Sequence, residues 1–394
     1  MFDVFRTTTE ESNEMRTTQG LPARFIFCLA LVSGLNCAFA EDDPVIGEKP
    51  LSELLKQLRS ENRGLQMRAS QALSAAPTNL HARIAPQVMP VLKSDRENDK
   101  FVAAQILGEY GALSKGAMPD LLPMLEGTQY ERNRAAAAKA LGQIFRDAQP
   151  GPEVDKVTDA LCRKFSDDPD SYVDVRRESV YACGRIGQSA KKCIPKLAAG
   201  LTDREIAVRR AAAWTCGRMG PLAAEHVDRL VSLMMTEGEN APEHVEALGL
   251  IGPVNANIAG NIMDKIETVD GVAEGIFSSN PAERFRAKAL VALGRFGPKA
   301  APAVPLVRRM AGGFGPDEFG FKLRTEIMNM LAAAGPEAKA ALPEIEAGLR
   351  YNNYSEWRIS QEDKVQLHKA LHEAAARAYK AVTGNEPPKA EEKK

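Results

Sequence analysis

The sequence predicts an all-α protein, a right-handed α-solenoid of eight or nine helix pairs between residues 51 and 384. Three observations lead to this expectation. Aromatic residues make up 6% of the chain although hydrophobic residues make up 44%, a balance that suits small, closely packed helices and suits β-sheets poorly. Glycines recur at the spacing of a helical repeat, and the apolar residues between them follow a helical period. Because this pattern recurs along the chain, its 394 residues are expected to form one repeat array rather than two or three separate domains.

A glycine marks the same point in successive repeats, near the end of the second helix of each pair. These landmark positions are Gly108, Gly142, Gly184, Gly217, Gly249 and Gly294, with Ala332 in the same column. A second glycine follows three residues later at Gly111, Gly187, Gly220, Gly252, Gly297 and Gly335, and Phe145 is the exception. A glycine just after a helix favours the left-handed conformation that ends it. Prolines after four of these glycines, and others that open the next helices, mark the remaining boundaries.

The apolar residues before each landmark lie on one helix face. Positions nine, five, four and one residues earlier are apolar or small, as at Val208, Ala212, Ala213 and Cys216. This spacing produces a single apolar stripe. A pair of such short helices cannot bury its stripe alone, so we expect neighbouring pairs to stack.

Several short motifs carry a resemblance to a known family. They are Val208-Arg209-Arg210 followed by Gly217-Arg218 and Gly220, Gly297-Pro298 with Ala300, and Ala303 with Pro305. The pattern resembles bacterial HEAT repeats, including the variety found in phycobilisome lyases. The resemblance covers residues 51–384 and implies a scaffold or adaptor, although a few enzymes are built from the same repeat.

The first forty residues are predicted to be a signal peptide. Residues 25–40 are apolar, too short to span a bilayer comfortably, and follow the basic Arg24. Ala38 and Ala40 supply the small residues that a signal peptidase requires. Residues 1–14 are unusually acidic for such a segment, so Met15 is a second candidate for the true start.

These features predict the domain boundaries and the compartment. We expect a linker over residues 41–50, the repeats over residues 51–384 and a disordered tail over residues 385–394. The mature protein is then extracytoplasmic, either periplasmic or secreted, with no membrane insertion after signal cleavage. An uncut signal anchor and a lipid attachment at Cys37 are the alternatives.

The charge balance argues against nucleic-acid binding. Lys and Arg total 51 residues and Asp and Glu total 52. A protein that grips nucleic acid usually carries a strong basic excess. We therefore expect another protein, rather than a nucleic acid, as the partner.

A basic residue lies eight positions before six of the seven landmarks, at Lys100, Arg134, Arg176, Arg209, Arg286 and Arg324. Asp170, Asp203 and Asn280 recur in the turn between paired helices. The resemblance to HEAT repeats implies that these side chains tie adjacent repeats together. A ligand-binding row of arginines is the alternative.

A second set of arginines clusters in the central repeats, at Arg177, Arg185, Arg210, Arg218 and Arg295. Such a strip can bind an acidic partner or a phosphate-bearing ligand. It can equally be a solvated surface balanced by nearby acids. From this set, Arg177, Arg210 and Arg218 are candidate partner-binding residues.

No cofactor, metal or catalytic site is predicted. The cysteines of the mature chain are Cys162, Cys183, Cys193 and Cys216, and none has the spacing of a zinc site. A Cys183–Cys216 disulfide is not expected, because stacked helices lie about 8–10 Å apart. His368 and His372 lie on one helix face but lack an evident third ligand.

Irregular segments are the places where a repeat protein can carry function. Residues 237–280 depart from the repeat pattern. Residues 311–321 form a lengthened glycine-rich connection with three phenylalanines. Residues 351–357 contain Tyr351, Tyr354 and Trp357, which are candidate partner-binding residues because Tyr and Trp dominate interface hot spots. Capping of the open end of the core is the alternative role for these aromatic residues.

Together these features predict an exported, non-catalytic protein-binding scaffold or adaptor. The alternative is a cofactor-handling or lyase-like enzyme with a site in residues 237–280. An accessory module of a cell-envelope assembly is a third possibility.

Overall fold

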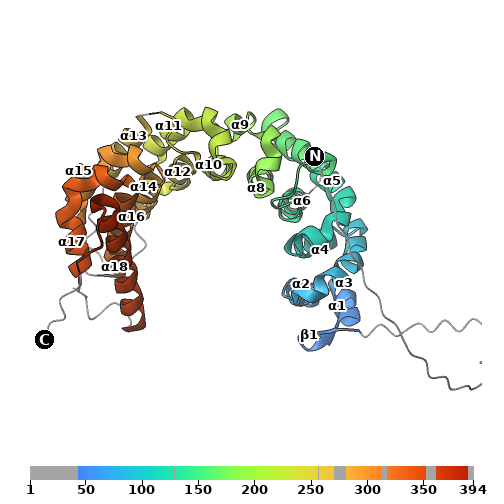
Figure 1. Cartoon of the computed structure of the whole chain (residues 1–394). Coiled ribbons are helices and arrows are strands. Elements are labelled where there is room, and N and C mark those ends of the chain that lie inside the picture. Colours follow the sequence, from blue (N-terminus) through green and yellow to red (C-terminus); the bar gives the residue numbers. More distant parts are fainter. Residues whose placement is uncertain are drawn as a thin grey trace, which may run out of the picture. The chain divides into compact units, whose positions relative to one another are not determined.

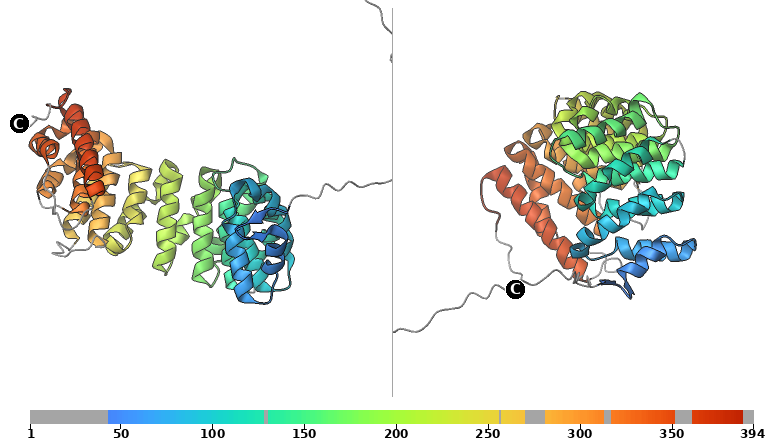
Figure 2. Two further views of the ribbon diagram at one scale, coloured as in Figure 1. Left: turned by 90° about the horizontal axis from the view of Figure 1, so that it is seen from below. Right: turned by 90° about the vertical axis from the view of Figure 1, so that its right-hand side faces the viewer.

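Pairs of antiparallel helices follow one another along the chain in the computed structural model, which confirms the expected all-α solenoid. The structure describes residues 43–127, 130–255, 257–269, 281–312, 317–351 and 361–388, all within one unit that starts at Asp43. These residues form 18 α-helices and therefore nine pairs, the upper number expected. Figure 1 labels the helices of this unit except α7, and Figure 2 shows that they keep their chain order along the row.

The first helices of the pairs are α1 (Leu51–Leu58), α3 (Thr78–Val88), α5 (Met118–Glu126), α7 (Pro152–Cys162), α9 (Leu197–Leu201), α11 (Val227–Glu237), α13 (Asn257–Thr268), α15 (Val304–Ala311) and α17 (Leu342–Arg350). The second helices are α2 (Arg63–Ser74), α4 (Glu97–Glu109), α6 (Glu131–Ile144), α8 (Val173–Ile186), α10 (Ile206–Met219), α12 (Glu243–Ile251), α14 (Pro281–Arg295), α16 (Glu318–Ala334) and α18 (Gln361–Thr383).

Short helical turns complete the connections. They are 3-10 helices at η1 (Met89–Lys93), η2 (Gly111–Ala117), η4 (Gly187–Cys193), η5 (Gly220–His226), η6 (Gly238–Asn240), η7 (Gly297–Ala303) and η8 (Gly335–Ala341), and a π-helical turn at η3 (Arg163–Asp167).

The even-numbered helices form one layer and the odd-numbered helices the other. From α4 onward each even-numbered helix packs chiefly against the next one, and they line the inner side of the row in Figure 1. One continuous apolar core extends between the layers from Ile46 to Val382. The inner layer therefore presents a surface to which several consecutive repeats contribute.

The landmark glycines allow the inner helices to approach closely. A Cβ atom on Gly142 would lie 2.5 Å from the Cα atom of Ala182 on the next inner helix, and one on Gly249 would lie 2.6 Å from that of Ala292. Real Cβ contacts are not this short, so only glycine fits without a backbone shift. Close helix-to-helix contact thus explains the glycine at these two positions of the column.

Glycine also ends most of the inner helices, as expected. Gly111, Gly187 and Gly220 have positive φ angles of 57°, 76° and 59° and open a 3-10 helix. Where Phe145 replaces the glycine, its φ is −100° and the positive φ occurs two residues later, at Asp147 with 49°. The chain therefore still turns there, but later.

The basic column forms a ladder between repeats, which confirms the structural interpretation for its central members. Arg134 donates two hydrogen bonds of 2.7 and 3.0 Å to the Asp170 carboxylate, and Arg176 donates two of 2.7 and 2.9 Å to Asp203. Arg209 continues the series by bonding to Glu237 of the next pair. Each of these acids belongs to the following repeat, so the ladder fixes the stacking of consecutive pairs.

The beginning of the array differs from the expected linker over residues 41–50. Val45–Ile46 (β1) and Lys49–Pro50 (β2) pair as an antiparallel hairpin, with Gly47 at a φ of 65° in the turn. Ile46 is buried in the common core. The expected signal peptide and residues 389–394 of the expected tail lie outside the described residues. In the part of the chain that the structure describes, no helix combines the length and apolar character needed to cross a membrane.

Candidate protein-binding surface

Two consecutive inner helices carry the same pattern of partly exposed side chains. In each, an aromatic residue has one arginine a helical turn before it and another a turn after it. The two triplets are Arg177, Tyr181 and Arg185 on α8, and Arg210, Trp214 and Arg218 on α10. Residues four apart lie on one face of a helix. The apolar residues of both helices face the core, so each triplet lies on the opposite, solvent-facing side.

The aromatic residues of the two triplets contact each other. The Tyr181 and Trp214 rings meet edge to face with centroids 5.3 Å apart, a favoured arrangement for aromatic pairs. Trp214 also packs against Gly184, where an added Cβ atom would lie 2.5 Å from the indole ring. Both rings are half-buried, and burial raises the pKa of the Tyr181 hydroxyl. These contacts fix the two rings as one aromatic patch, and both residues remain partly exposed to solvent.

The arginines on α8 are paired with acids of the same helix. Arg177 lies 2.8 Å from the Asp174 carboxylate and 3.2 Å from Glu178, and Arg185 lies 3.5 Å from Glu178. The positive charge of this part of the surface is thus largely balanced.

The arginines on α10 pair with acids of other repeats. Arg210 makes a bidentate contact of 2.6 and 2.9 Å with Glu243 on α12, which raises the pKa of the guanidinium further. Arg218 reaches Asp147, before α7, at 2.6 Å, although its side chain remains 41% exposed. These pairs orient the guanidinium planes around the aromatic patch. These side chains therefore do not form a purely basic strip.

A groove of about 610 Å³ begins at Arg210 and extends along the next inner helices. Its lining consists of Arg210, Asn240, Pro242, Glu243, Arg284, Ala287, Lys288, Glu318, Phe319 and Lys322. Four of these residues are basic and two are acidic, so the lining carries a net charge of +2. Arg284 is exposed and, among the residues that the structure describes, has no acidic partner. The other three cations pair with acids, Arg210 with Glu243, Lys288 with Glu246 and Lys322 with Glu318. Arg284 is therefore the cation open to a negatively charged group, while Ala287 and Phe319 supply apolar contact.

The candidate residues near the end of the array are in a different environment. Tyr351 packs edge to face on buried Phe321 at 5.1 Å, and the Arg324 guanidinium lies 4.3 Å from its ring centre. These contacts favour the capping role for Tyr351. Tyr354 and Trp357 lie outside the described residues.

The irregular region 237–280 contributes two different features. Asn240, Pro242 and Glu243 line the groove. His244 instead is fully buried, 3.6 Å from Glu237, and both of its ring nitrogens lack a hydrogen bond. Burial lowers the pKa of His244. Because neither His244 nor Glu237 lines the groove, this pair is closed to a substrate in the present conformation.

The comparisons with known proteins agree with this architecture. A family model described as HEAT repeats matches residues 158–249, a segment that contains both arginine–aromatic triplets. Yeast importin-β is similar with a TM-score of 0.58 and 13% identity, over 84% of this chain and 47% of that chain. The karyopherin Kap121p, solved bound to the extreme C-terminus of the protein phosphatase Cdc14p, gives a TM-score of 0.59 and 14% identity, over 84% of this chain and 39% of that chain.

The phycocyanin lyase complex of CpcE and CpcF from Nostoc gives a TM-score of 0.40 and 18% identity, over 74% of this chain and 97% of that chain. A comparison with curated protein sequences finds no match. The chain spans less than half the length of the importins, and these similarities show the solenoid fold.

Sequence reasoning identified the arginines of the surface but missed its aromatic centre. Tyr181 and Trp214 occupy the same column, three residues before Gly184 and Gly217, and each has an arginine four residues on either side. That repeated spacing was the available signal. The groove had no equivalent signal, because its lining comes from four helices and one connection that are separated in sequence.

Proposed function

We propose that this chain is an exported, non-catalytic protein-binding scaffold or adaptor that holds its partner on the inner surface of α8 and α10. The observation that carries this proposal is the Tyr181–Trp214 pair, framed by oriented arginines and adjoining a groove. Tyr, Trp and Arg are the residues most enriched at the energetic centres of protein interfaces. A partly exposed aromatic pair surrounded by paired charges is the arrangement expected of such a centre.

The groove indicates which kind of segment binds beside the aromatic patch. Its exposed Arg284, which pairs with no acid among the described residues, favours an extended segment with an acidic side chain. An apolar or aromatic side chain of the same segment would pack on Trp214. We therefore propose a partner with an acidic segment that also contains an apolar anchor.

Export is the second part of the proposal. It is supported by the apolar residues 25–40 and the small residues Ala38 and Ala40, which fit a cleavage site before Glu41. Mass spectrometry of the N-terminus of the protein from its native host tests this part. A mature chain that begins at Glu41 supports export, and a chain that retains residues 25–40 in the cytoplasm contradicts it.

The binding surface is tested with the chain lacking residues 1–40. Proteins captured from an envelope extract are identified, and the affinity of each purified candidate is then measured by isothermal titration calorimetry. We expect Trp214→Ala to weaken binding about tenfold or more, the cost of losing a hot-spot side chain. Leu113→Ala, at an exposed apolar residue of η2, is the matched control and should leave the affinity unchanged. Equal affinities for the wild type and Trp214→Ala would contradict the proposal.

A cofactor-handling or lyase-like activity is the second candidate function. The observation that favours it is the groove volume of about 610 Å³, which lies in the usual range for small-molecule sites. A small molecule that co-purifies with the protein and is lost in an Arg284→Glu variant would support it.

A further inference from the structure

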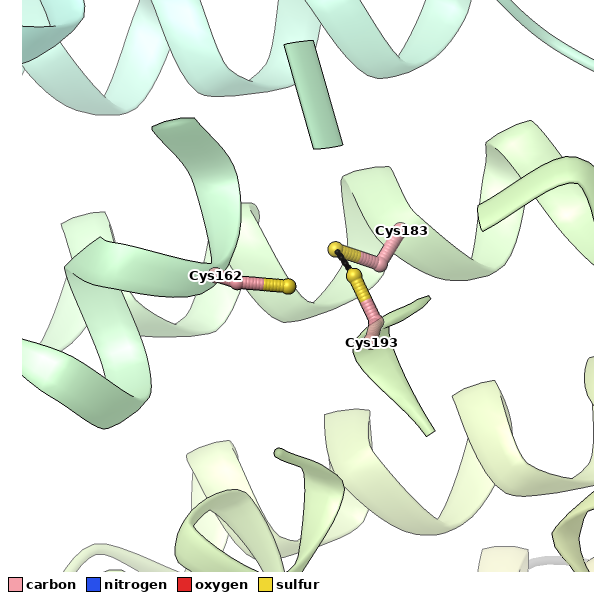
Figure 3. Close-up of side chains that lie close together, drawn as sticks. All are labelled: Cys162, Cys183 and Cys193. Carbon is pink, nitrogen blue, oxygen red and sulfur yellow. Dashed lines mark hydrogen bonds between the residues drawn. The ribbon is translucent and has the colours of Figure 1, made fainter. Parts of the chain in front are cut away.

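Three cysteines from three elements of the chain meet inside the array. Cys162 ends α7, Cys183 lies near the end of α8, and Cys193 ends η4. Their three sulfur atoms lie within 4.8 Å of one another, and Figure 3 shows all three side chains directed toward a common point. The Cys193 and Cys183 sulfurs are 2.8 Å apart. All three are free thiols, and all are buried.

The same three cysteines could bind a metal ion or form a disulfide. Their distances, the ligands around them and their burial favour the disulfide. A tetrahedral zinc ion with Zn–S bonds of about 2.3 Å holds its sulfur ligands about 3.8 Å apart, farther than Cys183 and Cys193 are. Among the described residues, no histidine or carboxylate joins the trio as a fourth ligand. A metal would also require several thiolates in an apolar interior, where charge is costly. A disulfide is uncharged and needs the closest two sulfurs to approach by less than 1 Å.

We propose that Cys162, Cys183 and Cys193 form a thiol–disulfide exchange site, in which Cys183 and Cys193 close to a disulfide and Cys162 is the thiol that meets the oxidant. The co-reactant is a disulfide-bearing oxidant, either a small molecule or the active site of a protein oxidase. This site is independent of the partner-binding surface.

Cys162 is the entry point because it is the least buried of the three. Its exposed fraction is 5%, whereas Cys183 and Cys193 are fully buried at 0%. Hydrogen bonds from the Cys183 and Cys193 thiols lower the pKa of Cys162, while burial raises the pKa of the other two. The thiolate is the attacking species in exchange, so these environments favour attack by Cys162.

The exchange proceeds in three steps that conserve atoms and electrons. The Cys162 thiolate attacks one sulfur of the oxidant, forms a mixed disulfide and releases the first thiol of the oxidant. Cys193 then attacks the Cys162 sulfur, giving a Cys162–Cys193 disulfide and releasing the second thiol. Finally Cys183 attacks Cys193 and regenerates the Cys162 thiolate. In sum, Cys183 and Cys193 lose two electrons and two protons, and the disulfide of the oxidant takes them up to become two thiols.

The disulfide would link two elements of consecutive repeats. Cys183 belongs to the inner helix α8, and Cys193 belongs to η4, which leads to the next pair. We therefore expect the oxidised chain to resist urea better than the reduced chain, with a higher midpoint of unfolding.

The test follows oxidation of the reduced chain lacking residues 1–40. The protein is incubated anaerobically with oxidised glutathione, free thiols are alkylated, and the peptides are analysed by mass spectrometry without reduction. We expect a Cys183–Cys193 linked peptide, an alkylated Cys162, and formation at least tenfold slower in Cys162→Ser. Cys162→Ala is the second variant, in case the serine hydroxyl disturbs folding. Cys216→Ser is the matched control, because Cys216 is also fully buried but lies outside the trio.

A trapping variant tests the order of the steps. In Cys183→Ala/Cys193→Ala, we expect one glutathione to remain bound to Cys162. The proposal is overturned if Cys183 and Cys193 stay reduced in the folded wild type, or if Cys162→Ser oxidises at the wild-type rate. It is also overturned if the protein contains one metal ion that is lost in all three single cysteine variants.

Discussion

The arginine ladder provides a quantitative test of how the repeats are held together. Arg176 is bound on both sides: its guanidinium pairs with Asp203 of the next repeat and donates hydrogen bonds of 2.8 and 3.2 Å to the carbonyls of Asp170 and Ser171. The Arg176 and Asp203 side chains are only 5% and 9% exposed. Replacing Arg176 by Met keeps most of the volume and removes the charge, so it leaves Asp203 buried without its cation.

Breaking a buried ion pair by removing one partner costs about 3–5 kcal/mol, because the remaining charge has been taken out of water. We expect Arg176→Met to lower the free energy of unfolding by this amount. Asp203→Asn should be similarly costly, since it leaves the buried guanidinium without an anion. The double variant contains neither charge, so its cost should fall below the sum of the single costs by about 1–3 kcal/mol.

The assay is urea unfolding followed by far-UV circular dichroism, with midpoints and slopes compared across the variants. Arg163→Met is the matched control, because Arg163 contacts Glu126 in an ion pair whose two side chains are each 48% exposed. A pair of that kind contributes less than about 1 kcal/mol. If Arg176→Met costs no more than Arg163→Met, or if the double variant is simply additive, the ladder does not stabilise the stack as described.

Three further predictions concern single buried sites. Gly142→Ala should lower the free energy of unfolding by about 1–3 kcal/mol, because its Cβ would lie 2.5 Å from the Ala182 backbone. Gly260→Ala, at a helical glycine with nothing within 4 Å of the added atom, should instead raise it by up to about 1 kcal/mol; the opposite order in urea unfolding would contradict the packing account. Ser179→Ala removes a buried hydroxyl that has no hydrogen-bond partner, so we expect a gain of about 1 kcal/mol, and a measured loss would show that the hydroxyl is satisfied. Burial holds the pKa of His244 below its ordinary value of 6.5, so its contribution to stability is complete above that value and is lost as the pH falls through the lower folded-state pKa. The urea concentration at the unfolding midpoint should therefore decrease as the pH is lowered from about 7.5 to about 5.5, and it should decrease less in His244→Phe. If that variant shows the same pH dependence as the wild type, groups other than His244 cause it.

The fold could be predicted from the sequence because every repeat meets the same physical requirements. Glycine is needed where two inner helices approach most closely, as at Gly142 and Gly249, and a positive φ ends several of the inner helices, as at Gly187. These requirements recur along the chain and so appear as columns. The first hairpin, β1–β2, occurs once and shows no column, which is why residues 45–50 looked like a linker.

The functional surface was harder to predict because it depends on contacts between repeats. The spacing of Arg210 and Arg218 was visible, but their pairing with Glu243 and Asp147 depends on how distant segments stack. The cysteine trio is the clearest case. Cys183 and Cys193 occupy columns of buried residues in other repeats, and nothing in their spacing shows that they meet Cys162.

Binding of a partner on the inner surface of α8 and α10 can be detected by site-specific photocrosslinking. A benzophenone amino acid keeps the phenyl ring of tyrosine, extended by a photoreactive benzoyl group, and can replace Tyr181 in the chain expressed in its native host. A second variant carries the same group at Leu113 in η2 as the control. We expect one discrete crosslinked protein from position 181, absent with the control and reduced by Trp214→Ala. A crosslink from position 113 alone, or none from position 181 under conditions where the partner is captured, would contradict it.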